Sequence, residues 1–411
     1  MFTIRSLGAA MLAAALAMPA HASSGWQASW YAAPQPAWSP GFALATNVPA
    51  TVAGTLREVL RLSTGGSAVR VVLSNRYGKV PLVVGAARLA RTAGEPGATS
   101  AIDAASDRAL TFAGRTAVTI PPGGAATSDP VALPVAALER LTVSAWLPGP
   151  APLTTFHWGA QQTGYLAPGN ATAAAKLGDA QRLQGRAFLA AVHVASQGGT
   201  IVALGDSITD GNGSTPDHHR RWPDFLAERL APQGTAVANA GISGARLLSS
   251  KMGVKAIERF DADVLKQPGV AAVVVLLGTN DIGWPGTAFA PHDPAMTAGR
   301  LIDGYRVLIA RARARGVRVI GGTLPPFGNA LPGTPFEGYW TQAKEAVRLE
   351  VNAWIRDSGE FDAVADFDAA LRNPAEPAHL RPEYDSGDHL HPNDAGFAAM
   401  ARAVPALPGA Q

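Results

Sequence analysis

Residues 200–209 read TIVALGDSIT, an apolar run that ends in a glycine and continues into polar residues. Similar apolar runs recur along the rest of the chain, and amphipathic stretches suited to helices, such as 222–230 and 301–315, separate them. The later runs are 236–240, 271–277, 317–321 and 363–365. This alternation predicts an α/β domain built on a doubly wound parallel sheet with helices on both faces.

Sheets of this kind place their sites at the carboxyl ends of the strands. Ser207 stands at that end of the first predicted strand, shortly after Gly205, which permits a sharp turn. A serine there is well placed as a nucleophile, because the following helix turns its free N–H groups toward developing negative charge. The alternative is a serine that caps the helix. The G-x-S-x-G elbow does not occur in the sequence, which disfavours the α/β-hydrolase fold.

The next two strand ends also carry residues suited to a site. The second predicted strand runs into Gly241 and Gly244, and glycines let a backbone approach a ligand, although a plain turn is the alternative. Asn280 follows the third predicted strand. Its amide is suited either to donate a hydrogen bond to an oxyanion or to cap a helix. All three strand ends should meet at one edge of the sheet.

Near the carboxyl terminus, the sequence DHLHP begins at Asp388. The three-residue spacing to His391 lets the carboxylate hold the Nδ1–H of the imidazole while Nε2 faces a nucleophile. In a competing interpretation, His389 and His391 ligate a metal, together with His218 and His219. The sequence contains no HExxH motif and no dense cluster of ligand residues, which favours the triad over the metal.

These four blocks, in this order, resemble the SGNH hydrolases, also called GDSL-type esterases, over about residues 200–404. The resemblance implies a flavodoxin-like three-layer α/β/α sandwich with strand order 2-1-3-4-5, and hydrolysis of acyl esters without a cofactor. Its catalytic residues correspond to Ser207, Asp388 and His391. Its oxyanion hole corresponds to the backbone N–H groups of Ser207 and Gly244 and the side-chain amide of Asn280. Gly244 is preferred to Gly241 because the family pattern places the functional glycine late in the second block.

Other residues near the strand ends have supporting roles in this interpretation. Asp206 is expected to support the turn rather than to react. Trp284, Pro326 and Phe327 follow strand ends and either wall the acyl pocket or pack within loops. His157 and His193 lie outside this region and are expected to be packing or surface residues.

Residues 23–198 read differently, as short strands between turns, which predicts a β-sandwich or jelly roll. Strands 55–63 and 68–75 flank the sequence TGGS, which is typical of a hairpin. Further strands are predicted at 82–90, 109–112, 117–120, 141–147 and 188–194. The region is similar to an N-terminal sandwich that precedes the SGNH domain in secreted bacterial members. We therefore predict a signal peptide at 1–22, a β-sandwich domain at 23–197 and a hydrolase domain at 198–411.

Five of the nine tryptophans belong to the predicted sandwich: Trp26, Trp30, Trp38, Trp146 and Trp158. Aromatic faces stack on sugars, so these side chains suit a carbohydrate platform; the alternative is that most of them fill the core or the domain interface. The spacer between the last strand of the sandwich and the first strand of the parallel sheet is only a few residues long. The two domains should therefore be in fixed contact.

The amino terminus has the pattern of a secretory signal: Arg5, then an apolar Ala-rich run, then AHA ending at Ala22. We expect a secreted or periplasmic protein without stable membrane insertion, since no apolar run reaches about 18 residues. The 34 basic and 31 acidic side chains give a formal charge of +3, too small to indicate a nucleic-acid partner. Cysteine is absent, which excludes disulfides, thiolate nucleophiles and Cys-based zinc sites.

Together these features predict a secreted serine esterase that removes acetyl or other short acyl groups, with a small-molecule or polysaccharide ester as substrate. Within enzymes, the alternative is a general short-chain carboxylesterase or lysophospholipase. From another class, the alternative is a carbohydrate-binding protein with a vestigial hydrolase domain. A complete set of nucleophile, base and oxyanion donors disfavours that last interpretation, because a binding module gains nothing from keeping it.

Overall fold

The computed structural model describes residues 25–38 and 48–406. Its carboxyl-terminal half is built on a five-stranded parallel sheet, which confirms the α/β prediction. The strands lie in the order β17-β16-β18-β19-β20, which is 2-1-3-4-5 along the chain, as the resemblance implied. They are β16 (Thr200–Gly205), β17 (Ala236–Gly241), β18 (Val270–Leu276), β19 (Arg318–Gly322) and β20 (Ala363–Ala365).

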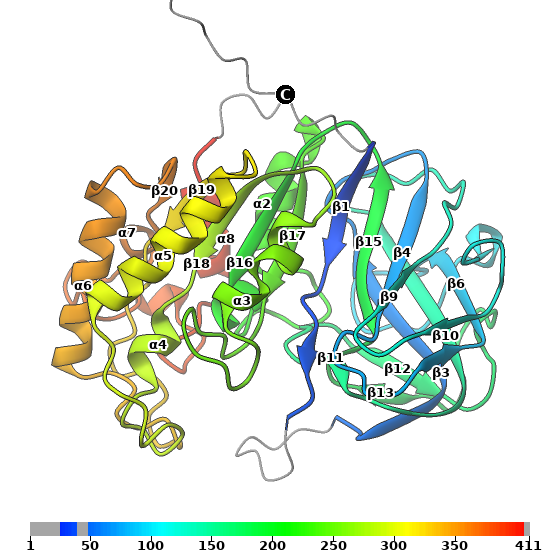
Figure 1. Cartoon of the computed structure of the whole chain (residues 1–411), viewed down its shortest axis with the longest axis horizontal. Helices are drawn as coiled ribbons and strands as arrows, with labels where there is room; N and C mark the ends of the chain where they lie inside the picture. Colours follow the sequence, from blue (N-terminus) through cyan, green and yellow to red (C-terminus); the bar gives the residue numbers. More distant parts are fainter. Residues whose placement is uncertain (1–24, 39–47, 407–411) are drawn as a thin grey trace, which may run out of the picture.

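Helices lie on both sides of this sheet (Figure 1). One group consists of α2, α7 and α8, which contact one another, and in the other group α5 contacts α3 and α6. The helices are α1 (Ser207–Asp210), α2 (Trp222–Leu230), α3 (Ala256–Phe260), α4 (Thr279–Gly283), α5 (Ala298–Arg313), α6 (Gln342–Asp357), α7 (Phe367–Leu371) and α8 (Asp394–Ala403). Single turns lie at η1 (Ala104–Ser106), η2 (Ala231–Gln233), η3 (Asp261–Leu265) and η4 (Pro382–Tyr384).

The amino-terminal half is a sandwich of antiparallel sheets, as predicted. A four-stranded sheet, β1-β15-β4-β9, and a six-stranded sheet, β13-β12-β3-β10-β6-β7, share one apolar core. Smaller sheets, β14-β11-β2 and β5-β8, complete this part. The strands are β1 (Trp26–Tyr31), β2 (Gln35–Pro36), β3 (Thr51–Arg61), β4 (Val69–Ser74), β5 (Leu82–Val84), β6 (Ala86–Arg91), β7 (Arg108–Ala109), β8 (Val118–Ile120), β9 (Ala125–Thr127), β10 (Arg140–Pro152), β11 (Thr155–His157), β12 (Gly164–Ala167), β13 (Gln181–Leu183), β14 (Arg186–Ala187) and β15 (Leu189–Ala195).

The predicted hairpin between 55–63 and 68–75 is wrong, although both strands exist. β3 pairs with β10 and β12 in the six-stranded sheet, whereas β4 pairs with β15 and β9 in the other sheet. The connection is a corner between the two sheets. Ser29 holds it there, because its hydroxyl donates to the Thr64 carbonyl (2.7 Å) and its carbonyl accepts from the Ser63 hydroxyl (2.6 Å). A turn motif cannot reveal such a distant partner.

The predicted strand 82–90 is divided at Gly85 into β5 and β6, which pair with β8 and β10 respectively. A Cβ at Gly85 would lie 2.6 Å from the Trp146 ring, so this glycine is required by close packing. The region predicted as strand 109–112 contributes only its first residue to β7. The strands predicted at 117–120, 141–147 and 188–194 correspond to β8, β10 and β15.

The two halves meet where the edge strand β1 lies beside the edge strand β17 (Figure 1). The Gln27 amide donates to the carbonyls of Gly199 (2.7 Å) and Gly234 (3.1 Å). The Tyr31 hydroxyl donates to the buried carboxylate of Asp263 (2.9 Å). Covering one sheet edge with another element removes an exposed ladder of backbone groups. The halves therefore share buried contacts, and Tyr31 belongs to the same apolar core as the parallel sheet.

The five tryptophans of the β-rich half differ in burial: only Trp30 is buried, and the other four are half-buried. Trp30 is buried in the core of the sandwich, and Trp26 lies under the Arg70 guanidinium. Trp38 donates to the Met252 carbonyl across the junction (2.6 Å) and contacts the ring of Trp158. The packing alternative therefore describes Trp30, and Trp38 lies at the interface between the two halves.

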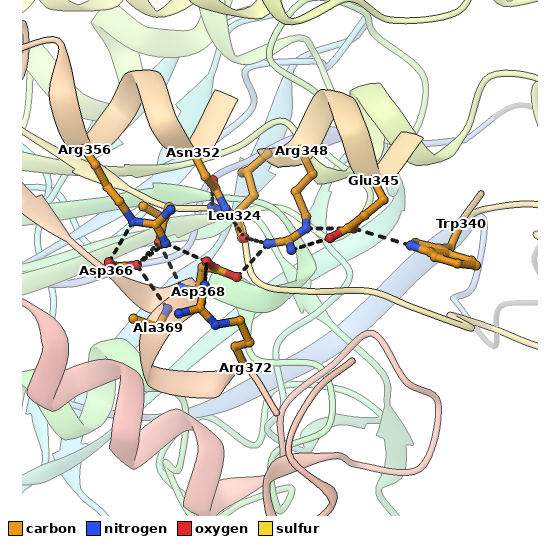
Figure 2. A network of polar contacts seen from close by, with 11 residues as sticks. Leu324, Trp340, Glu345, Arg348, Asn352, Arg356, Asp366, Asp368, Ala369 and Arg372 are labelled. Atoms are coloured by element: carbon orange, nitrogen blue, oxygen red, sulfur yellow. Dashed lines mark hydrogen bonds and ion pairs between the residues drawn. The ribbon is translucent and has the colours of Figure 1, made fainter. Parts of the chain in front are cut away.

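A network of buried charges fixes α6 to the loops after β19 and β20 (Figure 2). Arg348 has no exposed surface and contacts Glu345 (2.6 Å) and Asp368 (2.7 Å). It also donates to the Leu324 carbonyl (2.9 Å), and Asn352 binds the N–H and the carbonyl of the same residue. The network therefore fixes the part of the sheet that β19 and β20 form.

No helix among residues 25–38 and 48–406 is long and apolar enough to cross a membrane. The predicted signal peptide at 1–22 lies outside the described residues. The boundary predicted between residues 197 and 198 falls in the short connection from β15 to β16 and stays a prediction.

Candidate active site

Ser207 is the first residue of α1, directly after the sharp turn that ends β16. A Cβ at Gly205 would lie 2.0 Å from the Thr209 hydroxyl, so the turn leaves room only for glycine. Asp206 caps the helix, because its carboxylate accepts from the Ile208 N–H (3.0 Å). Burial raises the pKa of Asp206 to about 7. Asp206 therefore supports the turn, and the Ser207 side chain stands at the carboxyl end of the strand.

His391 and Asp388 meet Ser207 from the far end of the chain. The Nε2 atom of His391 lies 2.8 Å from the Ser207 Oγ, across 184 residues of sequence. The Nδ1 atom lies 2.5 Å from Asp388 Oδ2, while Asp388 Oδ1 accepts from the backbone N–H groups of Leu390 (3.0 Å) and His391 (2.8 Å). Burial opposes ionisation of Asp388, but its contacts with His391 outweigh burial and hold the pKa of this carboxyl well below its usual range. The carboxylate can thus orient a basic imidazole.

Gly244 and Asn280 lie on neighbouring loops at the same sheet edge. Gly244 has a φ of +73°, and a Cβ there would lie 2.2 Å from the Met252 sulfur, so both conformation and space require glycine. The Asn280 Nδ2 donates to the carbonyl of Ala245 (3.0 Å), the residue after Gly244. The Ile242 N–H of this loop donates to Gly205 (3.2 Å), just before the Ser207 turn. The structure therefore brings together every site residue predicted from the sequence.

Tyr339 and Asp281 support this arrangement, and sequence reasoning missed both. The Tyr339 hydroxyl lies 2.9 Å from Asn280 Oδ1 and donates to it, which leaves the amide nitrogen directed toward the Gly244 loop. Asp281 accepts from the N–H groups of Leu247 (2.8 Å) and Leu248 (3.0 Å), and burial raises its pKa to about 6. Tyr339 follows β19 by many residues, so its contact with Asn280 had no signal in the sequence.

The two histidines of the DHLHP sequence face different carboxylates. His389 Nδ1 lies 2.5 Å from Asp385, whereas His391 contacts Asp388 and Ser207. Within the described part of the chain, no group of three or more His, Asp or Glu side chains is arranged to hold a metal ion. The geometry favours the orienter–base arrangement of these residues.

Trp284, Pro326 and Phe327, considered as walls of an acyl pocket, are buried in the packed interior. Trp284 packs edge-on against Phe289, with ring centroids 4.8 Å apart, and Phe327 packs in the same way against Tyr339 (5.6 Å). Their environment is therefore that of side chains packed within loops, the alternative to walls of an acyl pocket.

His157 makes a contact that the sequence analysis did not predict. It is buried, with 4% of its surface exposed, and its Nε2 lies 2.9 Å from Oδ1 of Asp210 in α1. His157 belongs to β11 of the sandwich, so a side chain of the amino-terminal half reaches the helix that Ser207 begins. By contrast, His193 fits the expectation of a packing residue.

The segment that holds Ser207, Gly244, Asn280, Asp388 and His391 matches a known family. Residues 203–399 match the model of the GDSL-like Lipase/Acylhydrolase family. This part of the chain is a GDSL-like lipase/acylhydrolase domain, and the protein is an ester hydrolase. No curated protein matches the sequence.

Several solved structures are similar to half of the chain. A GDSL-like lipase from Bacteroides thetaiotaomicron is 19% identical, with 50% of this chain and 84% of that chain covered and a TM-score of 0.37. A lipase/acylhydrolase from Enterococcus faecalis is 22% identical, with 50% and 92% covered and a TM-score of 0.38. The aryl esterase of M. smegmatis is 16% identical, with 50% and 95% covered and a TM-score of 0.39.

Proposed function

We propose that the protein hydrolyses esters through a Ser207–His391–Asp388 triad. The 2.8 Å contact between His391 Nε2 and Ser207 Oγ carries this proposal. His391 takes the proton from Ser207 as the oxygen attacks the ester carbonyl, and Asp388 stabilises the imidazolium that forms. His391 then protonates the leaving alcohol, and water hydrolyses the acyl-enzyme by the same route.

The oxyanion of each tetrahedral intermediate is held by three donors in this proposal: the N–H groups of Ser207 and Gly244 and the Asn280 amide. Two observations support Asn280. The Tyr339 hydroxyl donates to the side-chain oxygen of Asn280, and the side-chain nitrogen of Asn280 points to the loop of Gly244. Donors fixed in this way need no reorganisation when charge develops.

The proposed substrate is a carbohydrate that carries acetyl or another short acyl group. A cleft formed by the β-rich half and the loop after α1 supports this choice; it is lined by Trp158, Gln161, Gln162, Arg182, Gln184 and Pro216. The Gln162 side chain is buried, and its Oε1 has no hydrogen-bond partner in the described structure. Amides, a guanidinium and an indole are suited to hydroxyl groups and sugar faces. The Gln161 amide also bonds to Asn212 (3.1 Å), close to the helix of Ser207.

We also propose that the protein is exported. This proposal rests on the signal-like sequence of residues 1–22 alone.

Replacement of the proposed nucleophile tests the mechanism. Ser207→Ala should abolish turnover of p-nitrophenyl acetate and labelling by a fluorophosphonate probe, while the thermal unfolding temperature stays close to that of the wild type. Ser128→Ala is the matched control, because Ser128 is a buried serine of the sandwich that accepts from the Val71 N–H (2.9 Å). Near-normal turnover in Ser207→Ala, or labelling that persists in it, would refute the triad.

A second experiment tests the substrate. Release of acetate from acetylated oligosaccharides should be faster than release of p-nitrophenol from p-nitrophenyl esters of longer acyl chains. The double variant Arg182→Ala and Gln184→Ala should raise KM for the oligosaccharide several-fold and leave p-nitrophenyl acetate unaffected. An unchanged KM, or a preference for long acyl chains, would favour a general carboxylesterase or lysophospholipase instead.

A further inference from the structure

A chain of buried polar contacts runs from the sandwich to the proposed oxyanion loop. It begins at His157, whose Nδ1 lies 3.0 Å from the Ala33 carbonyl oxygen and whose Nε2 lies 2.9 Å from Asp210 Oδ1. Because a carbonyl oxygen can only accept, Nδ1 carries a hydrogen. A further proton then lies between Nε2 and Oδ1. The contact is a hydrogen bond between an imidazole and a carboxyl group, both almost completely buried.

The second oxygen of Asp210 continues the chain. Asp210 Oδ2 accepts from the backbone N–H of Ser243 (2.8 Å) and from its hydroxyl (2.7 Å). Asp210 is the last residue of the helix that Ser207 begins, and Ser243 is the residue before Gly244. One carboxylate therefore connects the nucleophile's helix to the loop that bears the Gly244 N–H.

The backbone around this carboxylate leaves it little freedom. A Cβ at Gly159, which follows β11, would lie 2.0 Å from Asp210 Oδ2 and 2.5 Å from the Ser243 hydroxyl. A Cβ at Gly241 would lie 2.4 Å from the Asp210 nitrogen. Bare backbone from both halves of the chain thus packs directly on Asp210, and a shift of this side chain would move the oxyanion loop with it.

We propose that His157 is a positioning residue for ester hydrolysis, which acts through Asp210 and Ser243 on the N–H groups of Gly244 and Ser207. The inference rests on the proposed function, since it assumes those two N–H groups hold the oxyanion. Oxyanion donors contribute because they are already in place when charge develops, and misplacement by about 1 Å can cost about 10²-fold in rate. His157 lies outside residues 203–399, so the sandwich supplies part of the support of the active site.

Two substitutions of His157 separate positioning from simple packing. His157→Phe keeps an aromatic ring but removes both hydrogen bonds, and it should lower kcat about 10- to 100-fold with KM within about twofold. His157→Gln places an amide nitrogen where Nε2 lay, so it should restore most of the lost kcat. The control is Gln27→Met, which removes two partly buried hydrogen bonds at the opposite end of the junction and should leave kcat unchanged.

Inhibition by a trifluoromethyl ketone gives a readout of the oxyanion hole itself, because its adduct with a serine bears an oxyanion. Its Ki should rise in His157→Phe by about the factor by which kcat/KM falls, and should not change in Gln27→Met. The effects of His157→Phe and Ser243→Ala should also be less than additive, since both act on one chain of contacts.

Clear outcomes would overturn the inference. It fails if His157→Phe keeps the kcat and Ki of the wild type, or if His157→Gln loses as much activity as His157→Phe. If His157→Phe does not fold, Ser243→Ala decides: a several-fold lower kcat with a higher Ki supports the inference, and wild-type values refute it. Ser207→Ala distinguishes the two proposals, because it remains inactive when only the role of His157 is wrong.

Discussion

Two groups of carboxylates follow the carboxyl ends of the strands in the parallel sheet and differ in their main hydrogen-bond partners. Beside the proposed triad, Asp206 and Asp281 accept hydrogen bonds from the backbone N–H groups of Ile208, Leu247 and Leu248. Burial raises the pKa of Asp206 to about 7 and the pKa of Asp281 to about 6. These side chains orient the turn and the loop that carry the proposed catalytic groups.

After β20, Asp366 and Asp368 are held by guanidinium groups instead (Figure 2). Asp368 has no exposed side-chain surface and contacts Arg348 (2.7 Å), Arg356 (2.5 Å) and Arg372 (3.0 Å). Burial opposes ionisation of Asp366, but hydrogen bonds with Arg356 outweigh it and lower the pKa of Asp366 to about 2. Here the charges join α6 and α7 to the sheet.

The carboxyl ends of the strands are thus divided between the proposed chemistry and stability. Carboxylates bound by backbone amides fix the loops around Ser207, where small displacements alter a reaction. Carboxylates bound by arginines connect helices, where loss of one arginine weakens the compensation of a buried charge. Substitutions around Ser207 should therefore lower kcat, whereas substitutions in the arginine-bound group should lower the free energy of unfolding.

The largest expected difference in kcat is between variants of two buried asparagines, Asn280 and Asn352. Asn280→Ala should lower kcat about 10²–10³-fold, because one preorganised oxyanion donor is lost, and KM should change little. Asn352→Ala is the matched control: Asn352 also makes two buried hydrogen bonds, to the N–H (2.7 Å) and the carbonyl (2.9 Å) of Leu324. Both variants should lose stability, but only the first should lose activity. If kcat of Asn280→Ala stays within about threefold of the wild type, Asn280 is a structural residue and not an oxyanion donor.

The second contrast concerns stability. Arg348→Met should lower the free energy of unfolding by about 3 kcal/mol, because Glu345 and Asp368 lose a buried partner. Its kcat per folded molecule should remain unchanged. Arg306→Met is the control, since Arg306 pairs with Glu360 at an exposed position and such pairs contribute about 0–1 kcal/mol. Urea unfolding and p-nitrophenyl acetate turnover would measure both effects. Equal losses of stability in the two variants would contradict the division.

The parallel sheet, and the position of the candidate site residues on it, were predictable because their signals are local. Each apolar run became a strand, and Ser207, Gly244 and Asn280 follow strand ends that any doubly wound sheet brings to one edge. Asp388 and His391 are three residues apart, so their contact is also local.

Contacts between distant segments were not predictable. His157 and Asp210 are 53 residues apart, and Tyr339 reaches Asn280 across 59 residues. The hairpin was predicted wrongly for the same reason. The turn residues between β3 and β4 are compatible both with a hairpin and with a connection between two sheets, and only the strands that pair with β3 and β4 decide between these arrangements. Such partners depend on how the two sheets stack, which no short motif specifies.

The smallest predicted effect is the pH dependence of stability. The raised pKa of Asp206 means that the folded state resists its ionisation. Its contribution to stability is therefore complete below the pKa of the unfolded chain, near 4, and is lost as pH rises through about 7. Between pH 6 and pH 8 the wild type should lose about 1 kcal/mol from this group, and Asp206→Asn should remove that loss while keeping the helix cap.

Asp366→Asn is the counterpart from the arginine-bound group. The pKa of Asp366 is lowered to about 2, so its contribution is present above the unfolded pKa and is lost only as pH falls toward 2. Asp366→Asn should therefore destabilise the protein equally at pH 6 and pH 8, whereas the difference between Asp206→Asn and the wild type should change over that interval. Urea unfolding at the two pH values measures both. The same pH response in the two variants would show that the carboxylates beside the proposed triad are not held differently from those bound by arginines.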